Sequence, residues 1–145
     1  MTSTLLASTA VGATPVGDTG AHHASRIVVI DPRPERGAIT KLVVERCDAL
    51  TVVGLAATLG DAEPLIRTEQ AAIVLLEIQM PVPEGLATIA ALRDRFPDLR
   101  IVVCSFQSDA TTREAARASG ADGYLSKPLH LGELLTLLAS PRSNP

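Results

Sequence analysis

The sequence is poor in aromatic residues: among 145 residues it has no Trp, two Phe and one Tyr. The core must therefore be aliphatic, and a hydrophobic content of 46% is ample for one domain. The two cysteines, Cys47 and Cys104, fit neither a disulfide framework nor a zinc site. No apolar run approaches the roughly 20 residues of a membrane-spanning helix. These absences predict a cytoplasmic protein with no membrane partner.

A strong charge of either sign is also missing. The net charge is −3 and the isoelectric point is about 5.5, so we expect no direct binding of nucleic acid. Residues 1–25 carry one charged side chain, Asp18, and no periodicity, which predicts a flexible N-terminal tail. A secretory signal is the alternative, but the basic region is missing and Leu5-Leu6 is too short for the apolar one. We expect one folded domain over residues 26–140 and a C-terminal tail over residues 141–145.

Five short apolar runs bounded by turn formers predict buried strands. They cover residues 27–30, 51–56, 72–77, 100–105 and 123–126. Helical patterns follow each of them. Strands that alternate with helices predict an α/β fold, with a parallel sheet, helices on both faces and right-handed crossovers.

Apolar residues at helical spacing define the buried stripes of the predicted helices. The second helix should begin at a Gly60-Asp61 cap, with Pro64 in its first turn, and end near Glu69. The fourth should cover residues 110–119 and end at Gly120. The stripes are Ile39, Leu42, Val43 and Cys47 in the first helix, Leu86, Ile89, Leu92 and Phe96 in the third, and Leu131, Leu134, Leu135 and Leu138 in the last.

Polar side chains stand at the ends of four predicted strands: Asp31, Glu77, Ser105 and Lys127. The carboxyl ends of parallel strands share one edge of the sheet, where ligands bind in open α/β folds, so these groups should converge. Carboxylates suit a hard cation, whereas a lysine and a hydroxyl suit phosphoryl oxygens. The set therefore indicates a phosphoryl or metal site.

The strand ends and the turns after them carry specific motifs. These are Val-Ile-Asp31, Leu-Leu-Glu77-Ile-Gln-Met-Pro81, Glu84-Gly85-Leu86, Val-Cys-Ser105 and Gly120-Ala-Asp-Gly-Tyr-Leu-Ser-Lys127-Pro128. From Arg26 to about Ser140 the sequence resembles the receiver domain of bacterial response regulators, most closely receivers that precede a helix-turn-helix output domain. The resemblance implies a flavodoxin-like, doubly wound, five-stranded parallel sheet, (βα)5, with strand order 2-1-3-4-5. It also implies a role in two-component phosphorelay signalling.

The resemblance implies roles for individual residues at the sheet edge. In this family an aspartate at the position of Glu77 accepts a phosphoryl group from a histidine kinase. An acidic pair after the first strand holds Mg²⁺, together with the backbone carbonyl at the position of Gln79. In this sequence Asp31 is the first member of that pair.

The other family positions belong to the last two strands. The hydroxyl at Ser105 and the amine at Lys127 would engage the phosphoryl group. The aromatic residue at Tyr124 changes rotamer with the signal. The peptide bond between Lys127 and Pro128 is expected to be cis, as is usual in the family.

Two departures from the family pattern fall in this site. Glu77 replaces aspartate, and its extra methylene moves the carboxylate outward by ~1.5 Å. In-line attack tolerates little misplacement, and ~1 Å can reduce a rate by about a hundredfold. Pro32 replaces the second acid and supplies no ligand, so a magnesium site formed by Asp31, Glu77 and Gln79 should be weak or absent. Lys127 and Ser105 could then meet the longer carboxylate directly.

We therefore expect an atypical receiver that is not an enzyme, requires no cofactor and acts without aspartyl phosphorylation. No output domain follows Ser140, so we expect it to act through a separate protein, on a face formed by residues 110–119, residues 123–126 and the last helix. Leu137, off the buried stripe, is a candidate contact there. A homodimer and a histidine kinase are further candidate partners. Glu77 should partly mimic a phosphorylated aspartate, with Ser105 drawn towards it and Tyr124 turned inward.

Several alternatives stay open. The first is a working receiver that accepts phosphate at Glu77 with altered metal binding. The second is a flavodoxin-like enzyme or carrier, although residues 32–36 hold no phosphate-cradling run and aromatics to stack a flavin are lacking. Glu77 could also be a plain solvated acid, and Asp31 could only cap the next helix or pair with Lys127. Tyr124 could be ordinary strand packing.

Overall fold

The computed structural model describes residues 24–78 and 82–142. Residues 1–23 of the expected tail, residues 79–81 with Gln79, and residues 143–145 lie outside it. The elements in chain order are β1 (Ser25–Ile30), α1 (Pro34–Val44), β2 (Leu50–Ala56), α2 (Leu59–Thr68), β3 (Ile73–Leu76), α3 (Val82–Arg95), β4 (Arg100–Ser105), α4 (Ala110–Ser119), β5 (Gly123–Ser126) and α5 (Leu131–Ala139).

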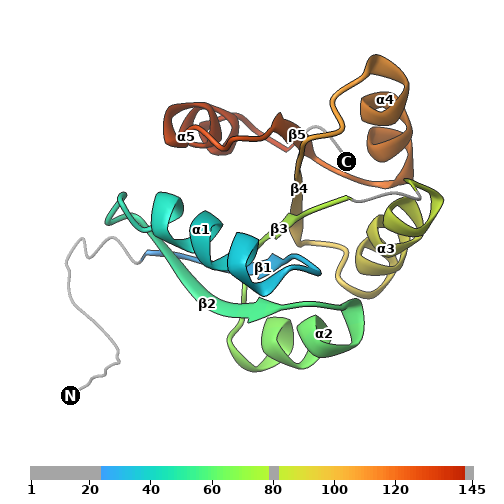
Figure 1. The fold of residues 1–145 in the computed structure, drawn as a ribbon. Helices are drawn as coiled ribbons and strands as arrows, with labels where there is room; N and C mark the ends of the chain where they lie inside the picture. The colour runs from blue at the N-terminus through green and yellow to red at the C-terminus, as the bar shows by residue number, and fades with distance from the viewer. Residues whose placement is uncertain (1–23, 79–81, 143–145) are drawn as a thin grey trace.

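The five strands form one parallel sheet in the order β2-β1-β3-β4-β5. Helices α1 and α5 cover one face of the sheet, and α2, α3 and α4 cover the other (Figure 1). The predicted fold class and strand order are therefore confirmed. None of the helices within the described residues is long and apolar enough to cross a membrane.

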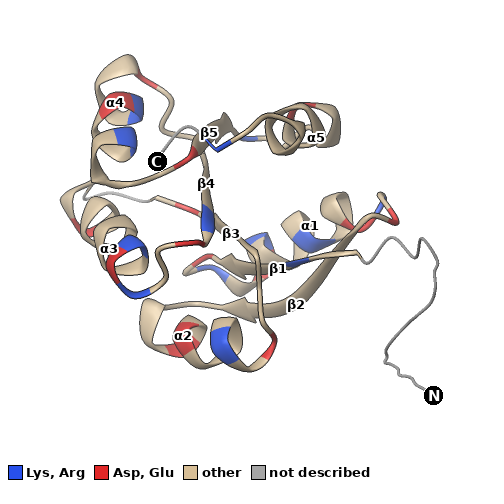
Figure 2. Cartoon of the chain, turned by 180° about the vertical axis from the view of Figure 1, so that it is seen from behind, with Lys and Arg blue, Asp and Glu red and all other residues tan. Residues whose placement is uncertain are grey.

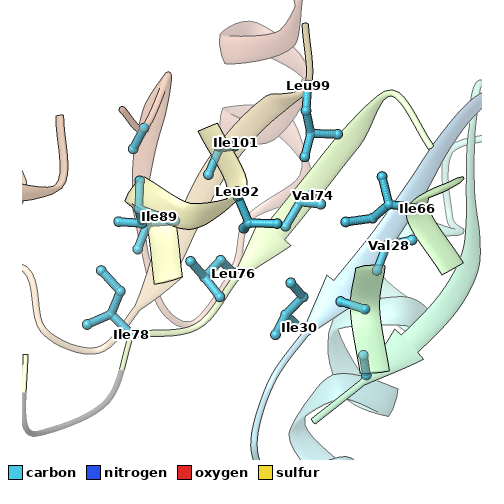
Figure 3. Packing of buried hydrophobic residues seen from close by; sticks show 14 of the residues in the cluster. Val28, Ile30, Ile66, Val74, Leu76, Ile78, Ile89, Leu92, Leu99 and Ile101 are labelled. Carbon is cyan, nitrogen blue, oxygen red and sulfur yellow. The ribbon is translucent and has the colours of Figure 1, made fainter. Parts of the chain in front are cut away.

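Strand β3 lies at the centre of the sheet and supplies both hydrophobic cores. Val74 and Leu76 point into the larger core, which lies under α2, α3 and α4 (Figure 3). Ile73 and Leu75 point into the smaller core under α1 and α5. Successive side chains of a strand alternate between faces, so a strand buried on both sides needs an unbroken apolar run. The run that begins at Ile73 meets this need and delivers Glu77 to the carboxyl edge.

Helix α1 does not bury the stripe that its apolar spacing predicted. Ile39 and Leu42 are 60% and 70% exposed, whereas Gly37, Thr40 and Val44 face the sheet. A Cβ at Gly37 would lie 3.8 Å from the Cβ of Asp31, an ordinary contact distance, so this position faces the end of β1. Hydrophobicity alone therefore does not select the buried face of α1.

Helix α2 begins earlier than predicted. Its N-cap is Thr58, whose hydroxyl accepts a hydrogen bond of 3.2 Å from the backbone N–H of Asp61. Gly60-Asp61 is therefore the interior of the first turn, and Pro64 lies inside the helix. Threonine is among the residues that favour the N-cap, so the sequence did carry this signal.

In helix α5, two leucines differ in burial from the prediction: Leu135 is exposed and Leu137 is half-buried. Leu134 is fully buried as expected, but Leu135 is 37% exposed. Leu137 is half-buried and packs over Gly123, where a Cβ would lie 2.4 Å from Leu137 Cδ1. Because Gly123 makes room for it, Leu137 belongs to the packing of α5 on β5 and is not the free contact that we expected.

Both predicted domain limits differ slightly from the observed ones. β1 begins at Ser25, whose N–H donates to the carbonyl of Ala49 at 2.8 Å. At the other end, Arg142 lies in the expected tail but pairs with Asp122 at 3.3 Å. Asp122 is fully buried in its side chain and also pairs with Arg93 at 2.6 Å. This buried cluster joins α3, the α4–β5 turn and the C-terminal segment, and the sequence analysis missed it.

Candidate functional site

The site lies where β1, β3, β4 and β5 end. Backbone hydrogen bonds between neighbouring strands fix these ends: Glu77 N–H donates to the Ile30 carbonyl at 2.9 Å, and Lys127 N–H donates to the Ser105 carbonyl at 2.9 Å. Asp31, Glu77 and Lys127, each the first residue after its strand, and Ser105, the last residue of β4, therefore lie at the same edge. Asp31, Glu77, Ser105 and Lys127 converge there, as predicted from their positions in the sequence.

Lys127 bridges the two carboxylates. Its Nζ lies 3.0 Å from Asp31 Oδ2 and 2.7 Å from Glu77 Oε1. The side chains of Lys127, Asp31 and Glu77 are only 8%, 2% and 4% exposed. Burial lowers the pKa of Lys127, but hydrogen bonds and charges from Glu77 and Asp31 outweigh it and raise the pKa above its usual value. The ammonium group is thus held charged between two acids.

Asp31 pairs with Lys127, one of the two alternatives considered for it, but it does not cap α1, whose N-cap is Arg33 and has no side-chain cap hydrogen bond. Its Oδ2 pairs with Lys127, and its Oδ1 accepts a hydrogen bond of 2.9 Å from the N–H of Arg33 at the start of α1. The carboxylate therefore orders the β1–α1 turn and anchors the lysine. Pro32 beside it is exposed and offers no side-chain oxygen.

Ser105 does not turn towards Glu77, so that expectation is wrong. Its hydroxyl is fully buried, donates to the carbonyl of Ile78 at 2.8 Å and accepts from the N–H of Gln107 at 3.0 Å. The only hydroxyl proton of Ser105 is therefore donated in a hydrogen bond to a backbone carbonyl just after β3. Ser105 therefore ties β3 to the β4–α4 loop, and it does not hydrogen-bond to Glu77.

Tyr124 is turned inward. Its half-buried ring packs on the larger core, and its hydroxyl donates to the carbonyl of Gln107 in the β4–α4 loop. Burial raises the pKa of Tyr124, and the nearby Ser105 hydroxyl and the charge of Arg113 oppose that shift. The peptide bond between Lys127 and Pro128 is cis, as expected.

Two residues near the site escaped the sequence analysis. Arg113 of α4 stacks over the Tyr124 ring, and Phe106 is 59% exposed at the mouth of the site, with Arg36 over its ring. Phe106 stands directly after Ser105, and this position could have drawn attention to it. Arg113 is one basic residue on a helix, and only the folded distances distinguish it from its neighbours.

Asp31 and Glu77 are the two described carboxylates at this edge that could contribute to a cation site. Among the described residues, no three His, Cys, Asp or Glu side chains are grouped closely enough to hold a metal ion. Asp31 and Glu77 both contact the Lys127 ammonium, which occupies the position between them. A divalent cation would have to displace a buried, favourably charged lysine and would gain two carboxylates. Gln79, the third expected contributor, lies outside the described residues.

Comparisons with known proteins agree with this geometry. A family model described as the response regulator receiver domain matches residues 27–139. The chain is 32% identical over 112 residues to the nitrate/nitrite response regulator protein NarL of Escherichia coli K12, which covers 77% of this chain and 52% of NarL. The chain spans about half the length of the curated relatives that it matches.

Solved structures show the same likeness. The crystal structure of a two-component response regulator of the LuxR family from Aurantimonas sp. SI85-9A1 is 27% identical, with a TM-score of 0.72 over 82% of this chain and 88% of that one. A response regulator from Thermotoga maritima, 23% identical, shares the fold with a TM-score of 0.71 over 81% of this chain and 99% of that one. The chain therefore belongs to the family of response regulator receiver domains.

Proposed function

We propose that this receiver is a signalling and protein-interaction module that works without aspartyl phosphorylation and without enzymatic activity. The observation that carries the proposal is the bridge from Lys127 to Asp31 and Glu77. The bridge offsets one of the two buried negative charges and fixes the carboxylate that stands at the acceptor position. Glu77, Ser105, Tyr124, Lys127 and Pro128 then form a static version of the family's switch.

Phosphoryl transfer to Glu77 would need its carboxylate oxygen in line with a donor. Glu77 Oε1 is instead directed to Lys127 at 2.7 Å, and the extra methylene displaces the carboxylate by ~1.5 Å relative to an aspartate. Mg²⁺ would also lack the ligand that Pro32 replaces. We therefore propose that the domain neither requires nor retains Mg²⁺ for its resting conformation.

The output is proposed to be contact with a separate protein. Acidic and basic residues are interspersed on α2, α3 and α4 (Figure 2), so these three helices offer no continuous basic face to nucleic acid. The face formed by α4, β5 and α5 holds Tyr124 and an open groove of about 880 Å³, which favours it for a protein partner. A second copy of this chain is the simplest candidate, and a histidine kinase is another.

One observation favours the alternative of a phosphate-accepting receiver. Glu77 lines two open cavities of about 310 and 380 Å³, so a small phosphodonor can approach it. A carboxylate that is reachable but paired can still react slowly. The test below separates this alternative from the proposal.

The test is intact-mass spectrometry after incubation with acetyl phosphate and Mg²⁺. The wild-type chain should show no stoichiometric addition of a phosphoryl group. Glu77→Asp alone should gain little, because Pro32 still denies the metal a ligand. The double variant Pro32→Asp with Glu77→Asp rebuilds the family pattern and serves as the positive control. Stoichiometric labelling of the wild type would overturn the proposal in favour of the alternative.

A further inference from the structure

Most arginine side chains of the described residues bond to a described carboxylate, hydroxyl or carbonyl. The exceptions are Arg33, Arg36 and Arg46, for which no ion pair or hydrogen bond to a described residue is present. The others bond to partners within the fold, as Arg26 does with Glu69 and Arg113 with Ser126. Two of these three, Arg33 and Arg36, lie close together, and Arg36 stacks over the ring of Phe106.

Arg33 and Arg36 line the same cavity at the mouth of the site. The cavity has a volume of about 380 Å³, and Glu77, Ser105 and Phe106 also line it. Lys127 offsets one of the two charges of Asp31 and Glu77, and Arg33 and Arg36 add two positive charges, so these five side chains sum to a charge of +1 at this mouth. Guanidinium forks match carboxylate and phosphate oxygens, which makes an anion the ligand that this cavity favours.

An apolar cavity adjoins the basic one. It has a volume of about 210 Å³ and shares Arg36 and Phe106 with the first cavity. Ile39 and Leu129 also line it, and Ile39 and Phe106 are 60% and 59% exposed. Together the two cavities fall within the roughly 300–1,000 Å³ of typical small-molecule sites. The exposed apolar residues of α1 thereby lie next to the unpaired charges.

We propose that this pair of cavities binds a small amphiphilic anion. Arg33 and Arg36 hold its carboxylate or phosphate head, and Phe106, Ile39 and Leu129 cover its apolar body. Neither arginine contacts Glu77 within the described contacts, so the site stands whether or not Glu77 accepts phosphate. This inference therefore goes beyond the proposed function and can fail or succeed separately from it.

The position of the site gives the ligand a route to the signalling face. Phe106 precedes Gln107. The Gln107 carbonyl accepts a hydrogen bond from the Tyr124 hydroxyl, and the Gln107 N–H donates one to the Ser105 hydroxyl. A ligand that repositions Phe106 therefore acts on the loop that holds Tyr124. Since Tyr124 is the single tyrosine and the chain has no Trp, tyrosine fluorescence reports this loop alone.

The experiment is isothermal titration calorimetry of the full chain with hexyl phosphate and hexanoate. Inorganic phosphate and hexanol supply the head and the apolar body separately. We expect saturable, one-to-one binding of at least one amphiphile, with each separate part at least tenfold weaker. The same titration followed by tyrosine fluorescence should give the same midpoint.

Arg33→Ala and Arg36→Ala should each weaken binding by about tenfold or more, as expected for a lost hydrogen bond to a charged group. Arg46→Ala is the matched control, because Arg46 is also unpaired but lines neither cavity, and its affinity should equal that of the wild type. Arg36→Gln keeps most of the side-chain length and guards against a folding defect in Arg36→Ala. The proposal is overturned if Arg33→Ala and Arg36→Ala both bind as tightly as the wild type, or if Arg46→Ala loses as much affinity as they do. It is also overturned if binding does not saturate at millimolar amphiphile. Binding of an acidic peptide with no binding of either amphiphile would also overturn it.

Discussion

The guanidinium of Arg113 lies 4.9 Å from the centre of the Tyr124 ring. The same side chain donates to the Ser108 carbonyl at 3.0 Å and to Ser126 Oγ at 2.8 Å. One residue of α4 therefore contacts the loop before α4, the aromatic ring of β5 and the hydroxyl that precedes Lys127. The orientation of Tyr124 is held from α4 as well as from the site.

The first prediction is that Arg113→Ala releases Tyr124. Loss of the stacking contact and of the hydrogen bond to Ser126 should destabilise the fold by about 1–2 kcal/mol. Acrylamide quenching of the single tyrosine should become stronger, because the ring loses its cover. Arg117→Ala, which removes an exposed arginine of the same helix paired with Glu114, is the control and should leave quenching unchanged. Equal quenching in wild type and Arg113→Ala would show that the core alone holds the ring.

The second prediction concerns Lys127. Lys127→Met leaves the buried carboxylates of Asp31 and Glu77 without their counter-charge, and breaking such a pair typically destabilises by about 3–5 kcal/mol. Glu77→Gln in the same chain removes one of the two charges and should restore part of the loss. Urea unfolding at pH 7 compares both variants with the wild type. A loss below about 1 kcal/mol for Lys127→Met would mean that water or solvent cations replace the ammonium readily.

Most of the fold was predictable from local patterns. The β3 run from Ile73 is apolar on both faces because it is central, and β4, α4 and β5 begin and end where predicted. Gly120 was predicted to end α4 and has a φ of 121°, which a side chain with a Cβ would strain. These signals are local, so one sequence is enough to show them.

The failures share a different cause, which is close packing between elements. Ile39 is exposed because α1 turns Gly37, Thr40 and Val44 to the sheet, and Leu137 is covered because Gly123 leaves room beneath it. At the site, the sequence predicted Ser105 close to Glu77, but it could not show that the Ser105 hydroxyl donates its hydrogen bond to the Ile78 carbonyl. Such choices depend on distances of a few tenths of an ångström between segments far apart in the chain.

The third prediction is a pH effect of Cys104. Burial raises the pKa of this thiol to about 12, with Lys127 lowering it and Glu77 raising it by smaller amounts. The unfolded chain releases the same proton near pH 9, its ordinary value. Between these values the unfolded state binds fewer protons, so the free energy of unfolding falls as pH rises, by about 1.4 kcal/mol per pH unit.

The slope of stability against pH isolates this contribution. Between pH 9.5 and 11, Cys104→Ala should lose stability less steeply than the wild type by about that amount, whatever its absolute stability. Cys47→Ala controls for the loss of a thiol elsewhere in the fold. Parallel curves for wild type and Cys104→Ala would show that the thiol ionises in the folded state as easily as in the unfolded one.

The fourth prediction concerns the buried cluster around Asp122. Asp122 pairs with Arg93 at 2.6 Å and accepts the N–H of Ile101 at 2.9 Å, with no exposure of its side chain. Asp122→Ala should destabilise by about 3–5 kcal/mol, because it leaves these buried donors unsatisfied. Glu114→Ala removes an exposed pair and should change stability by less than about 1 kcal/mol. Chemical unfolding compares the two variants, and similar losses would show that the pair at Asp122 is worth no more than a surface one.

The last prediction is that Glu77 holds the domain in one signalling conformation. A carboxylate carries one charge and two oxygens, against nearly two charges and three oxygens for a phosphoryl group, so it copies the signal only in part. Since Ser105 bonds to Ile78, the influence of Glu77 passes through Lys127, at the end of the strand that carries Tyr124. A bias of about 1 kcal/mol is at the lower end of typical coupling energies and corresponds to about a fivefold change in an equilibrium.

Glu77→Gln keeps the length of the side chain and removes its charge. Lys127→Ala removes the ammonium group that pairs with Glu77. Both variants should change self-association by about fivefold in sedimentation velocity and alter the quenching of Tyr124 in the same direction. Glu84→Gln is the control, because Glu84 lines one of the cavities beside Glu77 but forms no ion pair with a described residue. If both variants match the wild type in self-association and in quenching, the charge on Glu77 does not affect the conformation of the face that carries Tyr124. The domain would then act as a fixed scaffold whose binding face is set by α4 and Arg113 alone.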